Sequence, residues 1–327
     1  AYIDSFFGYH NFERFTSVVN NHSAPWYFYF LVVLAGFAPW SIYLPLAIAR
    51  WRIWRWRDWQ ATPRSQQLGL FALTWFGVIF GFFTVAVTKL PSYVLPLMPA
   101  AAILVGLLCS DRLMARRRSD WGLDLTVGAN VALALALAIL ALYSPNWMDD
   151  DPAMPNLPAV VRASGIMVGA AIVWGSAAIA GILLLIKRQA RWMWAVNLVA
   201  MVLFMVTTIF PGLEIMDSKR QAHLRTLAHT IQTQHRPGEE VVMVGFMKPT
   251  VVFYSELPVN FIRRTDETAT YLNATLNPVD KPSVLLIGRT TKINELDLDE
   301  SEILAAEAIQ AIEPYALIRV QAIANGA

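Results

Sequence analysis

Two short polar segments in an otherwise apolar sequence carry the residue types that could bind an anion. The first spans residues 6–15, where His10, Glu13 and Arg14 follow one another at helical spacings of three and four. An arginine there could donate two hydrogen bonds to a phosphate, so the segment could present an anion-binding face. The pattern equally fits an amphipathic helix on a membrane surface with one internal ion pair.

The second segment is the run of residues 88–93, Thr-Lys-Leu-Pro-Ser-Tyr. Lys89 stands alone between two apolar stretches, where a charge is costly unless it reaches the membrane surface or finds a partner. Pro91 fixes a sharp turn, and Tyr93 adds an amphipathic anchor beside it. A point charge held on a stiff turn at headgroup depth suits a phosphate. Extension of the lysine to the membrane surface is the alternative.

Composition places the chain among membrane proteins. Of its 327 residues 56% are hydrophobic and 15% are charged, whereas soluble domains have about 25% charged residues. The net charge of +2 gives no reason to expect a nucleic-acid partner. The single cysteine, Cys109, excludes a disulfide framework and a thiolate metal site. We predict no metal site; a divalent cation is left open as a cofactor.

Six apolar stretches approach the length of about 20 residues that crosses a bilayer. They are residues 26–49, 68–87, 94–109, 122–143, 165–186 and 192–210. The third is short and contains Pro96 and Pro99, which predict a kink or a partly re-entrant segment. The fold class predicted for this part is an all-α membrane bundle of about six transmembrane helices.

Basic residues in alternate loops indicate the orientation. The basic loops contain Arg50, Arg52, Arg55, Arg57 and Arg64, then Arg112, Arg116, Arg117 and Arg118, then Lys187, Arg188 and Arg191. The other loops contain Lys89 alone, then Asp149, Asp150, Asp151 and Arg162. The positive-inside rule makes the basic side cytoplasmic. We therefore predict a multi-pass protein of the cytoplasmic (inner) membrane whose C-terminal domain is extracytoplasmic.

The chain changes character after the last apolar stretch. Short apolar runs at 241–245, 259–262 and 283–287 predict buried strands, with a possible last strand at 316–320. Helices are predicted at 217–235, 250–255, 267–276 and 300–312. This alternation indicates a small soluble α/β domain with a mainly parallel sheet. The predicted organisation is an extracytoplasmic amphipathic segment (1–25), a transmembrane bundle (26–212) and an extracytoplasmic α/β domain (213–327).

Four ordered motifs resemble a known enzyme family. They occupy residues 9–15 (YHNFERF), 22–28 (HSAPWYF), 36–41 (GFAPWS) and 88–96 (TKLPSYVLP). Together they resemble the bacterial family 39 glycosyltransferases, relatives of protein O-mannosyltransferases, and especially the aminoarabinose-transferase-like branch. The resemblance covers most of the chain, including residues 248–254 (KPTVVFY) in the α/β domain.

The resemblance implies transfer of a sugar from a polyprenyl-phosphate donor to an acceptor outside the cytoplasmic membrane. The acceptor could be a lipid, a protein or a polymer, and membrane lipid is the surrounding partner. Arg14 and Lys89 would bind the donor phosphate, and His10, Asn11 and Tyr93 would line the lipid or substrate groove. Two cations there would stabilise the leaving phosphate.

Two departures from the family pattern limit what the resemblance implies. The loop that carries the family's catalytic carboxylate has no counterpart here. The expectation is therefore a C-terminal part, with no catalytic residue in this chain and no activity alone. His10 is displaced by one position from the branch's motif, so that branch's metal binding does not carry over to it.

Two other functions remain open from the residues alone. A non-catalytic membrane subunit or receptor would use the α/β domain to bind a ligand. A transporter fits less well, because the apolar stretches hold almost no charge near their centres and no inverted repeat is visible.

Overall fold

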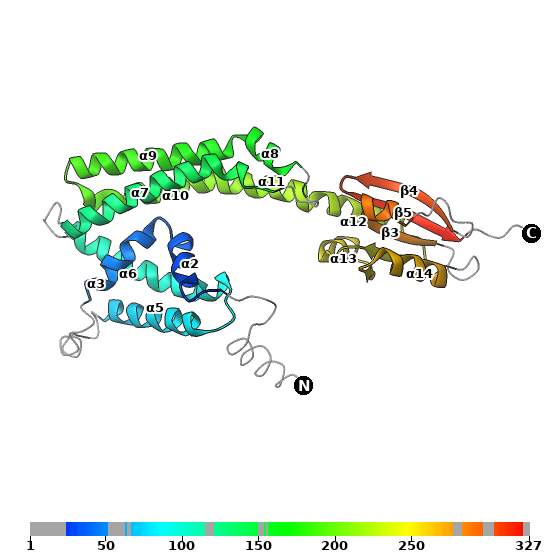
Figure 1. Cartoon of the computed structure of the whole chain (residues 1–327), viewed down its shortest axis with the longest axis horizontal. Helices are drawn as coiled ribbons and strands as arrows, with labels where there is room; N and C mark the ends of the chain where they lie inside the picture. The colour runs from blue at the N-terminus through cyan, green and yellow to red at the C-terminus, as the bar shows by residue number, and fades with distance from the viewer. Residues whose placement is uncertain are drawn as a thin grey trace, which may run out of the picture. The chain divides into compact units, whose positions relative to one another are not determined.

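The computed structural model of the chain describes residues 24–51, 63, 67–114, 121–149, 154, 156–276, 283–296 and 304–322. It forms two compact units, each of which is described by itself. The first unit contains residues 1–142 and 168–206, and the second contains residues 143–167 and 207–327. The order of the elements can be followed in Figure 1.

Most of the membrane helices lie in the first unit. Among the described residues, five helices are long and apolar enough to cross a membrane, and a bent pair makes a sixth if it counts as one span. The five are Leu68–Val85, Pro91–Met114, Trp121–Asn146, Ile166–Ile186 and Ala190–Arg220. Within them lie α5 (Leu68–Val85), α6 (Met98–Met114), α7 (Trp121–Tyr143), α9 (Ile166–Ile186) and α10 (Met193–Phe204). The predicted membrane bundle is confirmed.

The outward faces of these helices are apolar. The chain buries only 11% of the apolar stretch in Leu68–Val85 and 39% of the one in Pro91–Met114, which are the lowest and highest shares among the five helices. Side chains such as Val85 and Ile186 are 75% and 73% exposed. A water-soluble protein does not leave so large an apolar surface open. The hydrocarbon of a bilayer covers it, so the chain is a multi-pass membrane protein.

The first predicted span, residues 26–49, is broken in the middle. α2 (Phe28–Gly36) and the segment Trp40–Ala49, which contains α3 (Leu44–Ala49), are bent by 116°. Pro39 accounts for the break, because proline lacks an amide hydrogen and disfavours a helical residue before it. The carbonyl oxygen of Pro39 accepts a hydrogen bond of 3.0 Å from the side-chain amide of Asn130 in α7. The single predicted span is therefore two helical segments.

The third predicted span begins earlier and ends later than residues 94–109. It starts with a 3-10 helix over Pro91–Leu97, which contains Pro96, and continues as α6. The 3-10 helix accommodates Pro96, and Pro99 lies in the first turn of α6. The prolines thus mark the entry to the span.

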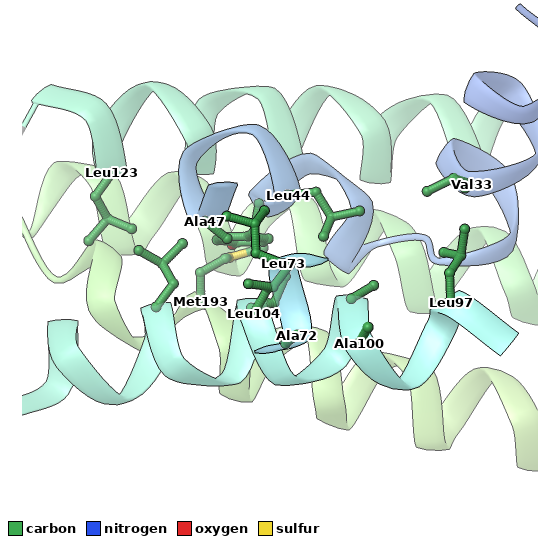
Figure 2. Close-up of a cluster of buried hydrophobic side chains, with 14 of the residues drawn as sticks. Val33, Leu44, Ala47, Ala72, Leu73, Leu97, Ala100, Leu104, Leu123 and Met193 are labelled. Atoms are coloured by element: carbon green, nitrogen blue, oxygen red, sulfur yellow. The ribbon is translucent and has the colours of Figure 1, made fainter. Parts of the chain in front are cut away.

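One buried cluster holds the broken segment against the other helices of the first unit. Figure 2 shows small and branched side chains that meet from α2, α3, α5, α6, α7 and α10. The labelled members are Val33, Leu44, Ala47, Ala72, Leu73, Leu97, Ala100, Leu104, Leu123 and Met193. Alanines at the contacts let the helix backbones approach closely, as membrane helices require.

The second unit begins with two helices that share an apolar cluster. α8 (Leu157–Ser164) packs against α11 (Phe210–Arg220), and their contact includes Leu157, Val161, Ile215 and Met216. The polar helix predicted over residues 217–235 is divided at Gln221 into the end of α11 and the separate helix α12 (Ala222–Gln234).

A five-stranded sheet follows α12, with strand order β2-β1-β3-β5-β4. β1 pairs with β2 and β3 in parallel, whereas β5 pairs with β3 and β4 antiparallel. The strands are β1 (Glu240–Val244), β2 (Val259–Ile262), β3 (Ser283–Arg289), β4 (Leu304–Ile312) and β5 (Tyr315–Ala322). The helices between them are α13 (Pro249–Ser255), α14 (Thr265–Thr275) and α15 (Thr290–Asn294).

Alternate residues of the central strands enter two cores, one on each face of the sheet. Val241 and Met243 pack with α12 and α13, while Val242 and Val244 pack with α14 and α15. This alternation is the period of two expected for strands covered on both faces. The predicted α/β domain is confirmed.

The helix predicted over residues 300–312 is wrong, because β4 occupies Leu304–Ile312. Alanine, glutamate and glutamine give this segment a high helix propensity. The neighbouring strand β5 is buried and needs a hydrogen-bonding partner along its free edge, and β4 provides it through a hairpin. Tertiary pairing therefore outweighs propensity, and the sheet is mixed instead of mainly parallel.

Candidate functional site

The turn between α5 and α6 places Lys89 against the end of α5. Its ammonium donates hydrogen bonds to the carbonyl oxygens of Ala86 at 2.7 Å and Thr84 at 2.8 Å, with a longer contact of 3.5 Å to that of Phe83. Carbonyls at a helix C-terminus lack partners within the helix and carry the negative end of its dipole. Lys89 therefore caps α5, and its side chain does not extend outward: the residue is only 7% exposed.

Carbonyl dipoles surround the positive charge of Lys89. No carboxylate among the described residues pairs with its ammonium. Burial lowers the pKa of this lysine, while its carbonyl partners favour the charged form. A buried cation that the described residues meet with carbonyls instead of a carboxylate would be stabilised further by an anion placed next to it.

Tyr29 of α2 holds the turn in place through its side chain. Its hydroxyl accepts a hydrogen bond from the backbone N–H of Leu90 and donates one to the carbonyl oxygen of the same residue, each at 3.2 Å. The ring of Tyr29 is fully buried, and its centroid lies 5.5 Å from Nζ of Lys89. The face of an aromatic ring attracts a cation at this distance. Tyr29 thus holds both the backbone and the charge of the turn.

A row of aromatic rings continues from Tyr29 to Tyr93. The ring of Phe83 lies 6.4 Å from that of Tyr29 and 5.0 Å from that of Tyr93. Tyr93 donates its backbone N–H to the carbonyl of Leu90 at 3.1 Å, which closes the first turn of the 3-10 helix. Its side chain is half-buried, whereas Pro91 and Ser92 are exposed. The turn therefore joins a buried cation to an aromatic, partly open surface.

The structure brings two of the five predicted site residues together. Lys89 and Tyr93 lie in one turn, on either side of Leu90 and Pro91. The other three, His10, Asn11 and Arg14, lie outside the described residues, so their approach to Lys89 stays a prediction. Tyr29 is a further residue of this turn that was not predicted, although the motif over residues 22–28 ends one residue before it.

A second charged cluster lies in the α/β domain. The side chains of Arg319 in β5 and Glu239 before β1 are 4% and 1% exposed, and Arg319 Nε donates to Glu239 Oε1 at 2.8 Å. Ser283 Oγ donates to the same oxygen at 2.7 Å. The carboxylate is saturated by the protein, so this cluster has a structural role. In the described part of the chain, no group of three or more His, Cys, Asp or Glu side chains is placed to hold a metal ion.

Comparison with known proteins shows that the chain is similar to glycosyltransferases. Residues 234–325 match the family of the cyanobacterial RgtA-type glycosyltransferase C-terminal domain. An undecaprenyl phosphate-alpha-4-amino-4-deoxy-L-arabinose arabinosyl transferase of Proteus mirabilis is 27% identical over 244 residues, which are 73% of this chain and 40% of the relative. A transferase of the same name from Pseudomonas fluorescens is 31% identical over 144 residues, which are 43% of this chain and 23% of that relative. The chain thus spans less than half the length of these relatives.

Solved structures show the same fold. The crystal structure of ArnT from Cupriavidus metallidurans bound to undecaprenyl phosphate matches 97% of this chain and 55% of its own, with a TM-score of 0.62 and 20% identity. The apo structure of the same protein gives a TM-score of 0.59 over 97% of this chain. The similarity predicted from the motifs is therefore confirmed for RgtA-type and ArnT-like glycosyltransferases.

Proposed function

We propose that the polypeptide with this sequence is a membrane glycosyltransferase of family 39. It transfers a sugar from a polyprenyl-phosphate donor to an acceptor on the outer face of the cytoplasmic membrane. The observation that carries the proposal is the buried ammonium of Lys89, which no carboxylate of the described residues neutralises, on the turn between two membrane helices. The similarity to transferases whose names include undecaprenyl phosphate supports the same donor class.

Lys89 supplies positive charge at the donor phosphate. Two of its hydrogen bonds are short and the third, to Phe83, is long enough at 3.5 Å to be weak. One proton of the ammonium can therefore turn toward an anion while the other two keep the cap on α5. Arg14 is the second cation of this site, and as a bidentate donor it binds the phosphate oxygens directly. Together they stabilise the charge that develops on the leaving phosphate.

The aromatic side of the turn receives the lipid part of the donor. Tyr93, with Phe83 beside it, presents a half-buried ring next to exposed Pro91 and Ser92. Amphipathic rings of this kind favour the boundary between hydrocarbon and headgroups. His10 and Asn11 complete the groove in this proposal. The sugar and the acceptor are left open, since the similarity does not extend over the whole length of the named relatives.

The site faces the outside of the cell. Arg50, Arg112 and Lys187 belong to loops that alternate with the turn of Lys89 along the chain. The positive-inside rule assigns those basic loops to the cytoplasm and the turn to the opposite side. By the same rule the α/β domain, which follows the last span, is extracytoplasmic.

Binding of undecaprenyl phosphate tests the site. Purified protein in detergent micelles is titrated with undecaprenyl phosphate and, in parallel, with the neutral polyprenol. Lys89→Met and Arg14→Ala each weaken binding of the phosphate form about tenfold or more, because a hydrogen bond to a charged group contributes about 1.5–3 kcal/mol. Both leave binding of the polyprenol unchanged.

Tyr29→Phe is the matched control for Lys89→Met. It removes both hydrogen bonds from the side chain to Leu90 but keeps the charge and the ring under Lys89. We expect phosphate binding in this variant to stay within about threefold of the wild type. Equal affinities for the phosphate and the neutral lipid in the wild type would exclude the proposed site.

A further inference from the structure

The α/β domain leaves two large apolar side chains open to solvent. In its described part, from α12 onward, Met247 and Phe253 are the large apolar residues that are mostly exposed, at 60% and 74%. Met247 follows the carboxyl end of β1, and Phe253 lies on the outer side of α13. Elsewhere in this part of the chain the sheet and its helices bury such side chains well, so these two require an explanation.

Several contacts tie this end of the domain to the end of α11. Thr250 Oγ1, at the start of α13, donates to Gln221 Oε1 at 2.8 Å. Arg225 in the first turn of α12 pairs with Asp217 of α11, and its guanidinium lies 6.0 Å from the ring centroid of Tyr254 in α13. α11, α12 and α13 therefore meet at one fixed corner.

The lengths of the elements explain why the carboxyl end of β1 returns to this corner. α12 has 13 residues and extends roughly 20 Å from α11. β1 runs back with five residues, about 17 Å. Because a helix rises about 1.5 Å per residue, Phe253 lies within about 5 Å of Thr250 along the axis of α13. Met247 and Phe253 thus belong to the end of the domain at which α11 arrives.

α11 is the end of a helix that is apolar enough to cross a membrane. The candidate span runs over Ala190–Arg220, and α11 forms its last turns. Phe210 and Leu213 are 56% and 61% exposed. The charged residues Asp217, Lys219 and Arg220 follow them. This change from apolar to charged within a few turns is typical of a helix that leaves the hydrocarbon for the headgroups.

Cations accompany the two exposed apolar side chains. A cavity of about 440 Å³ opens at the carboxyl ends of β1 and β2, lined by Gly245, Phe246, Met247, Phe261, Ile262 and Arg263. Arg263 is exposed and Lys248 is half-buried, and neither forms an ion pair with another described residue. Apolar side chains beside cations that no described carboxylate neutralises match the boundary of a bilayer that carries anionic headgroups.

We propose that Met247, Lys248, Phe253 and Arg263 form a membrane-docking surface of the α/β domain. Met247 and Phe253 enter the boundary between headgroups and acyl chains. Lys248 and Arg263 bind lipid phosphates, and one headgroup occupies the cavity beside Arg263. The surface holds the domain against the bilayer that α11 has just left. This inference depends on the membrane helix and the corner contacts, and it stands whether or not the chain takes part in sugar transfer.

Site-specific fluorescence in the full chain tests the docking surface. Cys109 is the single cysteine, so a Cys109→Ser background allows one label at a time. Met247→Cys, Phe253→Cys and Pro237→Cys each receive an environment-sensitive dye. The labelled chains are placed in nanodiscs of phosphatidylcholine, with or without phosphatidylglycerol and with or without lipids that carry a quencher near the headgroup. Pro237 is exposed at the opposite, amino end of β1 and serves as the control.

We expect the dyes at 247 and 253 to shift to the blue and to lose most of their emission with quencher lipids, while the dye at 237 does neither. Lys248→Gln with Arg263→Gln reduces quenching at 247 in bilayers that contain phosphatidylglycerol, as does added salt. Two results contradict the proposal. Dyes at 247 and 253 that stay unquenched would show that the surface faces water or a missing protein partner. Equal quenching at 237 would show that the domain has no preferred face toward the bilayer.

Discussion

Replacing Glu239 by glutamine removes one charge from a deeply buried ion pair. The side chains of Glu239 and Arg319 are 1% and 4% exposed. The carboxylate accepts hydrogen bonds from Arg319 Nε at 2.8 Å, Ser283 Oγ at 2.7 Å and the backbone N–H of Arg236 at 3.1 Å. Glutamine keeps one acceptor oxygen but turns an NH2 group toward donors. The buried arginine then keeps only the largely exposed carboxylate of Glu307, 3.9 Å from its Nη1, as a counter-charge.

The structure sets the size of the effect. Breaking a buried pair by removing one partner destabilises a domain by about 3–5 kcal/mol, since the other charge stays out of water. At about 1.4 kcal/mol for each factor of ten, the opened α/β domain becomes at least about a hundredfold more populated. The strands that meet at the pair are β1, β3 and β5 through residues 239, 283 and 319. Their backbone amides report the opening.

Hydrogen exchange of the full chain in detergent, read by mass spectrometry, measures this opening peptide by peptide. Glu307→Gln is the matched control. Its carboxylate lies 3.9 Å from Nη1 of the same arginine but is 59% exposed, so its loss costs less than about 1 kcal/mol. Faster exchange by a hundredfold is expected in the first variant and by less than about fivefold in the second. Equal increases in exchange in the two variants would refute the claim that the Glu239–Arg319 pair matters for stability because it is buried.

The same pair predicts how stability depends on pH. Burial alone would raise the pKa of Glu239, but hydrogen bonds from Arg319, Ser283 and the Arg236 amide outweigh it and lower that pKa. A carboxyl whose pKa is lower in the folded state stabilises the fold above its unfolded value of 4.5, and this contribution is lost as pH falls through the folded pKa. Protection of β1 should therefore decrease below pH 4.5 in the wild type. The Glu239→Gln variant should show a flatter profile.

Three further substitutions test individual contacts. Asn130→Leu leaves the Pro39 carbonyl without its 3.0 Å donor. We expect the free energy of unfolding to fall by about 1 kcal/mol, measured as a lower midpoint of thermal unfolding in detergent. An unchanged midpoint would show that the broken span does not need this bond. Gly245→Ala strains a residue with φ of +76° and brings a Cβ to 3.3 Å from Lys292 Cγ. We expect the free energy of opening at β1 to fall by about 1–2 kcal/mol, seen as faster hydrogen exchange. Gly106→Ala, with open space around its Cβ, should leave this exchange unchanged. Tyr29→Phe removes the acceptor of the Leu90 N–H, while the Leu90 carbonyl keeps its hydrogen bond from the Tyr93 N–H. We expect the free energy of opening over residues 88–93 to fall by about 1–3 kcal/mol, seen as faster hydrogen exchange. Full protection there would mean that water replaces the hydroxyl.

The elements that could be predicted from the sequence are those whose apolar residues form a continuous run. The membrane spans follow from the length of apolar runs, and β1 to β3 follow from short apolar runs between polar segments. Pro39 lies within the motif over residues 36–41, yet the break in the helix was not predicted. The carbonyl that the 116° bend exposes pairs with Asn130, which is 91 residues away in the sequence.

β4 shows the opposite limit. Its alanines and glutamate favour a helix at the level of single residues, and most of its side chains are exposed. An edge strand buries few side chains, so its apolar pattern is weak. Only the need of β5 for a second partner determines that Leu304–Ile312 is extended.

The candidate site was predicted in its residues but not in its geometry. A charge on a stiff turn could be read from Lys89 and Pro91. The ammonium turns back onto the carbonyls of Thr84 and Ala86. This contact depends on the residue at which α5 ends, and hydropathy does not locate the end of a helix to one residue. Tyr29 reaches the turn from 61 residues away, and no local pattern announces such a contact.

Sugar transfer by the full polypeptide that carries this sequence tests the central claim most directly. The protein is reconstituted in proteoliposomes with a series of undecaprenyl phosphate-linked sugars as donors and a series of acceptors, and release of undecaprenyl phosphate is followed with time. We predict release by the wild type and a loss of about a hundredfold in rate in Arg14→Ala and in Lys89→Ala, since each removes one stabilising contact to the leaving phosphate. Wild-type rates in both variants would contradict the account.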